Sequence, residues 1–369
     1  RFRKDFCRVR KVCRKVLSAI MAVKSADRKE ERALRSRTKT HLSEDKIIEL
    51  ARINLGKDCE IQNIRELKGG MFNAIYRMER IREQDTVVLK VGVKPGTPLL
   101  TYEQDVMPTE VEGFRLLEEQ TTVPAPRVLA YDFSKEHIPA NYFFMTAMEG
   151  VPLSSVAKKM SRENRDRLLA ELAGCLAQMH QIKGPYFGYF TTDRKKQYAT
   201  WKEAFLQMFG QLLKDCRDRK TKIPYERIER VLKKYAGYLE DMKTAALVEY
   251  DCHEGNVFVK KENGEYQIEG ILDLERAFWG DPVADFPTAF IFTDDIRRER
   301  AFLEGYLKAS PEKKVYTEED AVRFQLYRLY ILVIMAAEIF RYGFLYGRLQ
   351  YLCSLYGIRK CLDFLERGD

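Results

Sequence analysis

A β-hairpin with polar residues at its open end is the feature that most constrains how this sequence can fold. Val257-Phe258-Val259 is a run of residues that favour strands, and Asn263-Gly264 is the dipeptide most typical of a type I′ turn. Gln267 to Leu272 is predicted to return as the second strand. Symmetrical pairing about the turn places Ile271 opposite Asn256, so the residues that flank the two strands are expected to meet at one end.

Three polar residues flank this hairpin, and their types suit phosphate chemistry assisted by a metal ion. Asp251 and Asn256 precede the first strand, and Asp273 follows the second. An Asp can accept the proton of an attacking hydroxyl, while an Asn and a second Asp offer the hard oxygen ligands that Mg²⁺ prefers. A solvated hairpin with ordinary polar ends is the alternative, because short motifs often match by chance. The second Asp in register favours the functional interpretation.

A glycine pair and a lysine in an apolar strand lie upstream of the hairpin. Gly69 and Gly70 precede the β-rich run Ala74 to Met78, and adjacent glycines let backbone N–H groups approach a phosphate closely. In the next predicted strand, Lys90 shares a face with Val88. This lysine is either an edge charge with a snorkelling stem or a phosphate-binding group, and its place after a glycine loop favours the second.

A carboxylate partner for Lys90 is expected on the following helix. An amphipathic stretch runs from Thr109 to about Glu119, with Glu110, Phe114 and Leu117 on one face. Glu110 therefore lies on the buried stripe and is the candidate partner. Glu112 is expected to close a capping box with Thr109 at the start of this helix.

These stretches together resemble the aminoglycoside phosphotransferase and choline kinase superfamily, the small-molecule branch of the protein-kinase-like fold. The resemblance spans about residues 45 to 345. It is carried by Gly69 to Asn73, Val88 to Lys90, Thr109 to Leu117, Leu247 to Val259 and Gly270 to Asp285. It implies an α+β, bilobal fold with a small β-rich N-lobe and a larger, mostly helical C-lobe.

The resemblance also implies roles for single residues. Asp251 would be the catalytic base, and Asn256 and Asp273 would hold Mg²⁺. Asp281 and Asp285 would brace the catalytic loop. The nucleotide, ATP, would be bound by Gly69, Gly70, Lys90, Glu110, the backbone at Thr146 and Met148, and His253. His180, by contrast, is interpreted as a structural histidine.

Glu249-Tyr250 stands directly before Asp251, where the resembled family usually has His-Gly. A buried Glu249 would add a negative charge beside Asp251 and disfavour its ionised form. A Glu249 that points outward would have no such effect. This departure motivates the alternative function of a nucleotide-binding pseudokinase or scaffold.

Length and composition divide the chain of 369 residues into three parts. We expect a basic helical extension over residues 1–40, a nucleotide-binding N-lobe over 41–147, and a C-lobe over 148–369 with the catalytic loop and acceptor pocket. No segment reaches the roughly 18 uninterrupted apolar residues of a membrane span. Eight cysteines without a C-x-x-C pair indicate free thiols in a reducing compartment, so a cytoplasmic location is expected.

The net charge of +9 arises at the N-terminus. Residues 1–40 hold 15 Lys/Arg and 4 Asp/Glu, whereas the remainder is near neutral, so a nucleic-acid partner is not expected. Apolar residues from Phe2 to Val23 recur every three or four positions, which predicts a cationic amphipathic helix. Residues 1–24 could then contact a membrane surface or a partner. A native start at Met21 is the alternative, because the sequence opens on Arg1.

The acceptor is left open between two kinds of small cation. The aromatic residues between 321 and 365 would suit a quaternary amine through cation–π contacts, while Asp294, Asp295 and Glu338 would suit a polycationic aminoglycoside. The prediction is an ATP-dependent kinase that transfers the γ-phosphoryl group to a hydroxyl of an aminoglycoside-like or amino-alcohol acceptor. A protein kinase is disfavoured, because no Ala-Pro-Glu segment follows Asp273.

Overall fold

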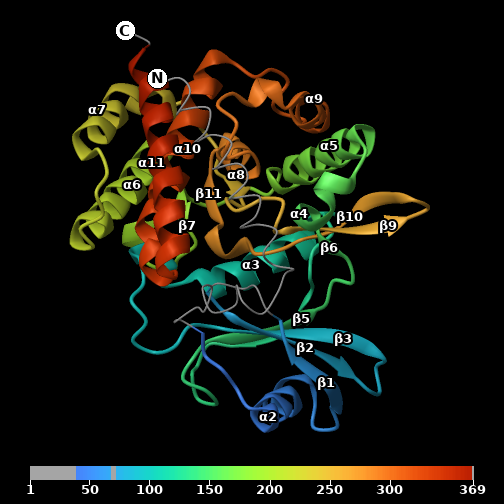
Figure 1. Cartoon of the computed structure of the whole chain (residues 1–369). Coiled ribbons are helices and arrows are strands. Elements are labelled where there is room, and N and C mark those ends of the chain that lie inside the picture. The colour runs from blue at the N-terminus through green and yellow to red at the C-terminus, as the bar shows by residue number, and fades with distance from the viewer. Residues whose placement is uncertain (1–38, 68–71, 368–369) are drawn as a thin grey trace.

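The computed structural model describes residues 39–67 and 72–367 and has a small β-rich lobe joined to a larger helical lobe (Figure 1). The predicted bilobal α+β architecture is therefore confirmed. The described residues do not include Gly69, Gly70 or Met21. They also do not include residues 1–24, through which a contact was expected. The boundaries expected at 40 and 147 stay predictions.

The N-lobe is built on one antiparallel sheet whose strand order is β1-β2-β3-β5-β4. Helix α2 covers one face of this sheet and helix α3 lies on the other, toward the C-lobe (Figure 1). The elements are α2 (Glu44–Leu55), β1 (Ile61–Glu66), β2 (Ala74–Arg80), β3 (Asp85–Val91), η2 (Thr101–Glu103), α3 (Val106–Gln120), β4 (Val128–Asp132) and β5 (Tyr142–Thr146).

Strand β3 alternates as predicted, because successive side chains of a strand point to opposite faces. Val87, Leu89 and Val91 pack beneath the sheet with α2. Val88 belongs to the larger core on the other side, and Lys90 shares that face. The lysine is thus carried by a buried central strand and points toward α3 and the C-lobe.

Helix α3 begins at Val106, three residues before its expected start. Pro108 lies in the first turn, where its missing N–H costs no intrahelical hydrogen bond. The predicted capping box of Thr109 and Glu112 is wrong, because both residues already lie inside the helix, and Thr109 N donates to Asp105 O at 3.0 Å. Glu110 is buried on the predicted face.

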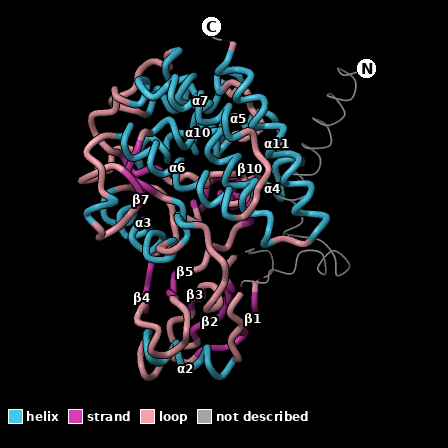
Figure 2. The backbone as a smooth tube through the Cα atoms, turned by 90° about the vertical axis from the view of Figure 1, so that its left-hand side faces the viewer, coloured by secondary structure: helices cyan, strands magenta, loops and turns pink. Residues whose placement is uncertain are grey.

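The C-lobe is mostly helical (Figure 2), and its central helix α10 is buried on nearly all sides, as expected of a helix that is apolar all round. The helices are α4 (Leu153–Val156), α5 (Arg162–Met179), α6 (Trp201–Asp218), α7 (Tyr225–Tyr235), α8 (Asp285–Ala289), α9 (Arg300–Ala309), α10 (Glu318–Ala337) and α11 (Phe344–Glu366). Short 3₁₀ helices include η6 (Leu274–Arg276), η7 (Pro282–Ala284) and η9 (Glu338–Arg341).

The remaining strands form two small three-stranded sheets, β10-β9-β6 and β7-β11-β8. Their bounds are β6 (Val151–Pro152), β7 (Gly188–Tyr189), β8 (Ala246–Val248), β9 (Val257–Glu262), β10 (Glu265–Ile271) and β11 (Phe278–Gly280). They carry the loop that connects β8 to β9 and the segment that follows β10.

The hairpin of β9 and β10 is confirmed with one correction. Asn263 and Gly264 have φ of 49° and 90°, as a type I′ turn requires. The register shifts by one residue between Ile268 and Gly270, so Ile271 lies opposite Val257. The predicted pairing of Ile271 with Asn256 is therefore wrong, because a β-bulge adds one residue to β10.

The six cysteines among the described residues are buried and free of disulfides, as expected. Within the described part of the chain, no helix is both long enough and apolar enough to cross a membrane.

The close approach of α3 to η6 depends on Gly113. A Cβ at this position would lie 2.8 Å from Leu274 Cδ2, directly after Asp273. We expect Gly113→Val to lose about 1–3 kcal/mol of unfolding free energy through overpacking. Gly210→Val is the matched control, because Gly210 is an exposed helical glycine with open space around its Cβ position. Denaturant unfolding of both variants tests this, and equal stability of the two would contradict it.

Candidate active site

The loop from Glu249 to Asn256 is anchored at its start by a buried carboxylate. The N–H groups of Glu249 and Tyr250 donate to the two oxygens of Asp285 at 3.1 and 2.6 Å. His180 Nε2 lies 2.9 Å from Asp285 Oδ2, and its Nδ1 lies 2.7 Å from the hydroxyl of Tyr306. His180 and Asp285 are thus placed to brace this loop, which agrees with their expected structural roles.

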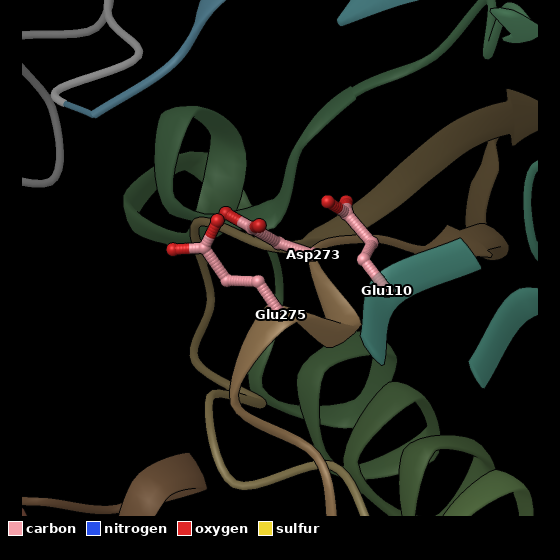
Figure 3. Close-up of side chains that lie close together, drawn as sticks. All are labelled: Glu110, Asp273 and Glu275. Atoms are coloured by element: carbon pink, nitrogen blue, oxygen red, sulfur yellow. The ribbon is translucent and has the colours of Figure 1, made fainter. Parts of the chain in front are cut away.

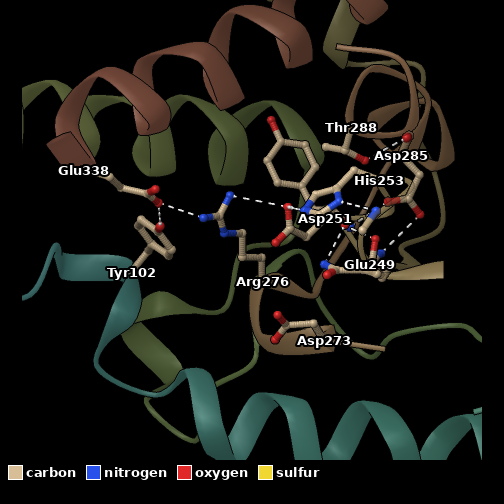
Figure 4. A network of polar contacts seen from close by, with 12 residues as sticks. Tyr102, Glu249, Asp251, His253, Asp273, Arg276, Asp285, Thr288 and Glu338 are labelled. Carbon is tan, nitrogen blue, oxygen red and sulfur yellow. Dashed lines mark hydrogen bonds and ion pairs between the residues drawn. The ribbon is translucent and has the colours of Figure 1, made fainter. Parts of the chain in front are cut away.

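Asp251 lies at the centre of a polar network that Figure 4 shows from close by. Its N–H donates to Glu249 Oε2 at 2.7 Å, and its Oδ1 lies 3.6 Å from the Arg276 guanidinium. Asn256 donates its amide N–H to Asp251 O at 3.1 Å, which leaves the amide oxygen as the group that a cation could use. His253 Nε2 lies 4.0 Å from Asp251 Oδ1.

Glu249 points inward and its side chain is fully buried, so the outward-pointing alternative is wrong. The cause is the brace described above, which turns the backbone at this point. Tyr250 has φ of 61°, in the left-handed region that glycine favours. Its hydroxyl donates to Tyr327 O at 2.7 Å, which helps to hold this conformation.

Lys90 is the cation at the centre of three carboxylates. Its Nζ lies 2.6 Å from Glu110 Oε2, 2.8 Å from Asp273 Oδ1 and 3.4 Å from Glu275 Oε2. Figure 3 shows these carboxylates turned toward one another from α3 and from the segment after β10. The pairing of Lys90 with Glu110 therefore has the geometry that the sequence predicted.

The charges of this cluster are unbalanced. Burial opposes the charge of Lys90, but Asp273, Glu110 and Glu275 together raise its pKa well above the ordinary value. Burial, opposed by Lys90, raises the pKa of Glu110 to about 8. Burial and the neighbouring Asp273 raise the pKa of Glu275 to about 7. Three carboxyls share one ammonium, so the site has room for the charge of a second cation.

The donor set fits Mg²⁺. Oxygens of Glu110, Asp273 and Glu275 lie within 4.8 Å of one another, and hard oxygen ligands are those that Mg²⁺ takes. Asp273 has φ of 71°, a left-handed conformation that Asp tolerates better than most residues. Its carboxylate, with the amide oxygen of Asn256, would be available to hold the ion.

The segment between the lobes begins where β5 ends at Thr146. Ala147 N donates to Thr86 O at 3.1 Å, and the N–H groups of Glu149 and Gly150 donate to the Glu269 carboxylate. Among the described backbone hydrogen bonds, Met148 makes none. No backbone partner of Met148 therefore competes with a ligand at this position.

The acids proposed for a cationic acceptor all have arginine partners. Glu338 lies 2.8 Å from Arg276 and accepts from the Tyr102 hydroxyl at 2.7 Å. Asp294 and Asp295 pair in the same way with Arg328 and Arg297. Tyr327 and Tyr330, from the expected aromatic wall, are buried in the core. Phe340 and Phe344, from the same expected wall, are exposed.

Three residues of this site were missed by the sequence analysis. Glu275 and Arg276 follow Asp273 within one turn, and Asn73 donates to Glu275 Oε2 at 3.1 Å from the end of the glycine-rich segment. The available signal was the charged pair Glu275-Arg276, which follows Asp273 after one leucine. Its partners could not be inferred, because they come from distant elements.

The two lobes, the lysine–glutamate pair and the braced loop define a protein-kinase-like phosphotransferase. The model of the phosphotransferase enzyme family (APH) matches residues 63–321 of this chain. The chain belongs to that family and is a phosphotransferase that acts on hydroxyl groups. No curated protein sequence matches it.

Solved structures of the same fold are distant in sequence. A thermostable aminoglycoside phosphotransferase APH(4)-Ia with AMP-PNP and hygromycin B is 16% identical at a TM-score of 0.56, covering 87% of this chain and 98% of that one. The streptomycin–ATP complex of APH(2″)-IIa is 18% identical at a TM-score of 0.56, with coverages of 85% and 97%. ADP-bound APH(2″)-Ib is 17% identical at a TM-score of 0.54, with coverages of 87% and 99%. These likenesses concern the fold.

Proposed function

We propose that this protein uses ATP to phosphorylate a hydroxyl group of a small acceptor, with Asp251 as catalytic base. The observation that carries the proposal is the convergence of Asp251, Asn256 and the Lys90 cluster at one end of the β9–β10 hairpin. The nucleotide complexes of APH(4)-Ia and APH(2″)-IIa support ATP as the donor.

The reaction moves one phosphoryl group and one proton. The acceptor hydroxyl oxygen bonds to the γ-phosphorus, and the bond from that phosphorus to the β–γ bridging oxygen breaks, so ADP leaves with the electron pair. The hydroxyl proton passes to a carboxylate oxygen of Asp251. Arg276, 3.6 Å away, holds that carboxylate in place from the side of Glu338.

The remaining residues position the nucleotide. Lys90 would contact the α- and β-phosphates, and Glu110 would keep its ammonium oriented. The backbone at Thr146 and Met148 would meet adenine, and His253 would lie near the γ-phosphate. Mg²⁺ held by Asp273 and Asn256 would neutralise charge on the phosphates.

The acceptor is proposed as an aminoglycoside-like compound or an amino alcohol. The structures of APH(4)-Ia and APH(2″)-IIa are complexes with hygromycin B and streptomycin, which supports this class. The arginine partners of Glu338, Asp294 and Asp295 count against strongly polycationic compounds. A test panel therefore needs neutral polyols beside the cations.

The pseudokinase alternative is not favoured. Glu249 and Tyr250 motivated it, but the chain keeps the proposed base Asp251 and the proposed metal ligands Asn256 and Asp273, and the family is one of enzymes.

ADP release from Mg·ATP tests the proposal against aminoglycosides, choline, ethanolamine, homoserine and simple sugars. Acceptor-dependent release would establish the activity and indicate the substrate class. Binding of Mg·ATP without release for any acceptor would support the pseudokinase alternative.

Binding of Mg²⁺ to this cluster should release protons near pH 7. Glu275 and Glu110 have pKa values raised to about 7 and about 8, and an added cation favours their ionised forms. Titration calorimetry in two buffers of different ionisation enthalpy measures the release, and Glu275→Gln should reduce it. Proton uptake, or no dependence on the buffer, would contradict this reading of the cluster.

A further inference from the structure

Glu249 differs from the other carboxyls of the catalytic loop in the number of its donors. Asp285 accepts from two backbone N–H groups and contacts the His180 imidazole. Asp251 faces the Arg276 guanidinium. Glu249 Oε2 accepts one N–H, and its buried Oε1 has no hydrogen-bond partner among the described residues.

A buried carboxylate with one donor is costly to keep ionised, whereas a neutral carboxylic acid in the same place costs much less. Asp251 and Asp285 already have the cationic or multiple donors that favour a charge. Of the three carboxyls, Glu249 is therefore the one that should hold a proton.

The groups that face Glu249 reinforce this. Burial raises the pKa of Glu249 well above its ordinary value, and the charges of Asp285, Asp251 and Asp273 raise it further. The thiol of Cys252 and the phenol of Tyr250 are kept neutral, because burial raises the pKa of each. Arg276 and the His180 imidazole contact Asp251 and Asp285 instead of Glu249.

We propose that Glu249 is a positioning residue for phosphoryl transfer and acts as a neutral carboxylic acid. Its oxygen accepts the N–H of Asp251 and thereby keeps the Asp251 carboxylate aimed at the acceptor hydroxyl. This role rests on the proposed kinase function. In the resembled family a histidine usually stands at this position, and here a protonated glutamate would take its place.

Loss of the Glu249 proton should disturb the loop. The ionised form places a second negative charge beside Asp251 and leaves a charge on Oε1, which has no hydrogen-bond partner within the described part of the chain. Because the folded-state pKa is raised, its contribution to stability is fully present below the unfolded-state pKa. That contribution is lost as the pH rises through the folded-state pKa. Both kcat and the unfolding midpoint should therefore fall as the pH rises toward and through the folded-state pKa of Glu249.

Three variants test the proposal. Glu249→Gln keeps a neutral acceptor for the Asp251 N–H, Glu249→Ala removes it, and Glu262→Gln is a control at an exposed position of the β9–β10 hairpin. The measurements are kcat and KM for ATP from pH 6 to 10, the unfolding midpoint over the same range, and the infrared C=O band of a protonated carboxyl.

Glu249→Ala should lower kcat by about 10- to 100-fold with little change in KM for ATP, because the base is misplaced and the nucleotide site is intact. Glu249→Gln should recover most of that loss and flatten the fall of kcat and of the unfolding midpoint with rising pH. The wild-type infrared spectrum minus that of Glu249→Gln should show a protonated-carboxyl band, and the wild-type spectrum minus that of Glu262→Gln should show none.

Equal impairment of Glu249→Gln and Glu249→Ala would overturn the proposal, as would wild-type and Glu249→Gln pH profiles that coincide. A wild type with no turnover on any acceptor would overturn the proposed function and the transfer role with it. The infrared band and the unfolding profile would then still decide whether Glu249 carries the proton, so the two failures are distinguishable.

Discussion

Asp251→Asn should lower kcat by about 10²- to 10⁴-fold, the usual contribution of a positioned general base. Asn has nearly the same volume as Asp, and the backbone N–H that binds Glu249 is unchanged, so the loop should keep its position. What is lost is the group that takes the acceptor proton and the partner of Arg276. Affinity for Mg·ATP should remain close to that of the wild type.

Steady-state kinetics combined with a direct nucleotide-binding titration checks this prediction. The expected pattern is a loss in kcat with an unchanged dissociation constant for the nucleotide. A variant that retained the wild-type kcat would remove Asp251 from the chemistry. A variant that lost nucleotide binding as well would show that Asp251 holds the site together instead.

Asp273→Asn should reduce Mg·ATP-dependent turnover by about 10³-fold, because it removes the carboxylate that Lys90 contacts at 2.8 Å and that would hold Mg²⁺. Asn also tolerates the left-handed backbone at this position. The substitution therefore removes the negative charge of the side chain and leaves its size and the backbone conformation nearly unchanged. The free protein should not lose stability, since one of three carboxylates around a single ammonium becomes neutral. Stabilisation by Mg·ADP should be lost.

Asp85→Asn is the matched control for this variant. Asp85 pairs with Arg80 at 2.6 Å near the solvent-exposed start of β3, away from the cluster. Its loss should cost less than about 1 kcal/mol and leave turnover unchanged. Thermal unfolding with and without Mg·ADP, together with turnover, separates the two variants. Unchanged turnover in Asp273→Asn would show that the proposed metal site is misplaced.

Local signals predicted the parts of this molecule that are set by short stretches of sequence. The turn at Asn263-Gly264 follows from backbone preference, and the direction of Lys90 follows from the two-residue period of a strand. Glu110 was found from helical periodicity, because its face is shared with Phe114 and Leu117.

The features that were missed depend on partners far along the chain. The bulge that shifts the register of β10 leaves no clear mark in the sequence. The burial of Glu249 is set by Asp285. Glu275 and Arg276 became recognisable only when their contacts with Asn73 and Glu338 were known. Long-range pairing of charged side chains cannot be read from local periodicity, because it depends on how the elements pack.

Transfer of a labelled γ-phosphoryl group from ATP to an acceptor tests the central claim most directly. Wild-type protein and Asp251→Asn would be incubated with labelled Mg·ATP and the acceptor panel, and the products separated. The account predicts a labelled acceptor with the wild type and its near absence with Asp251→Asn. Label found only in ATP or in inorganic phosphate, for every acceptor tested, would contradict it.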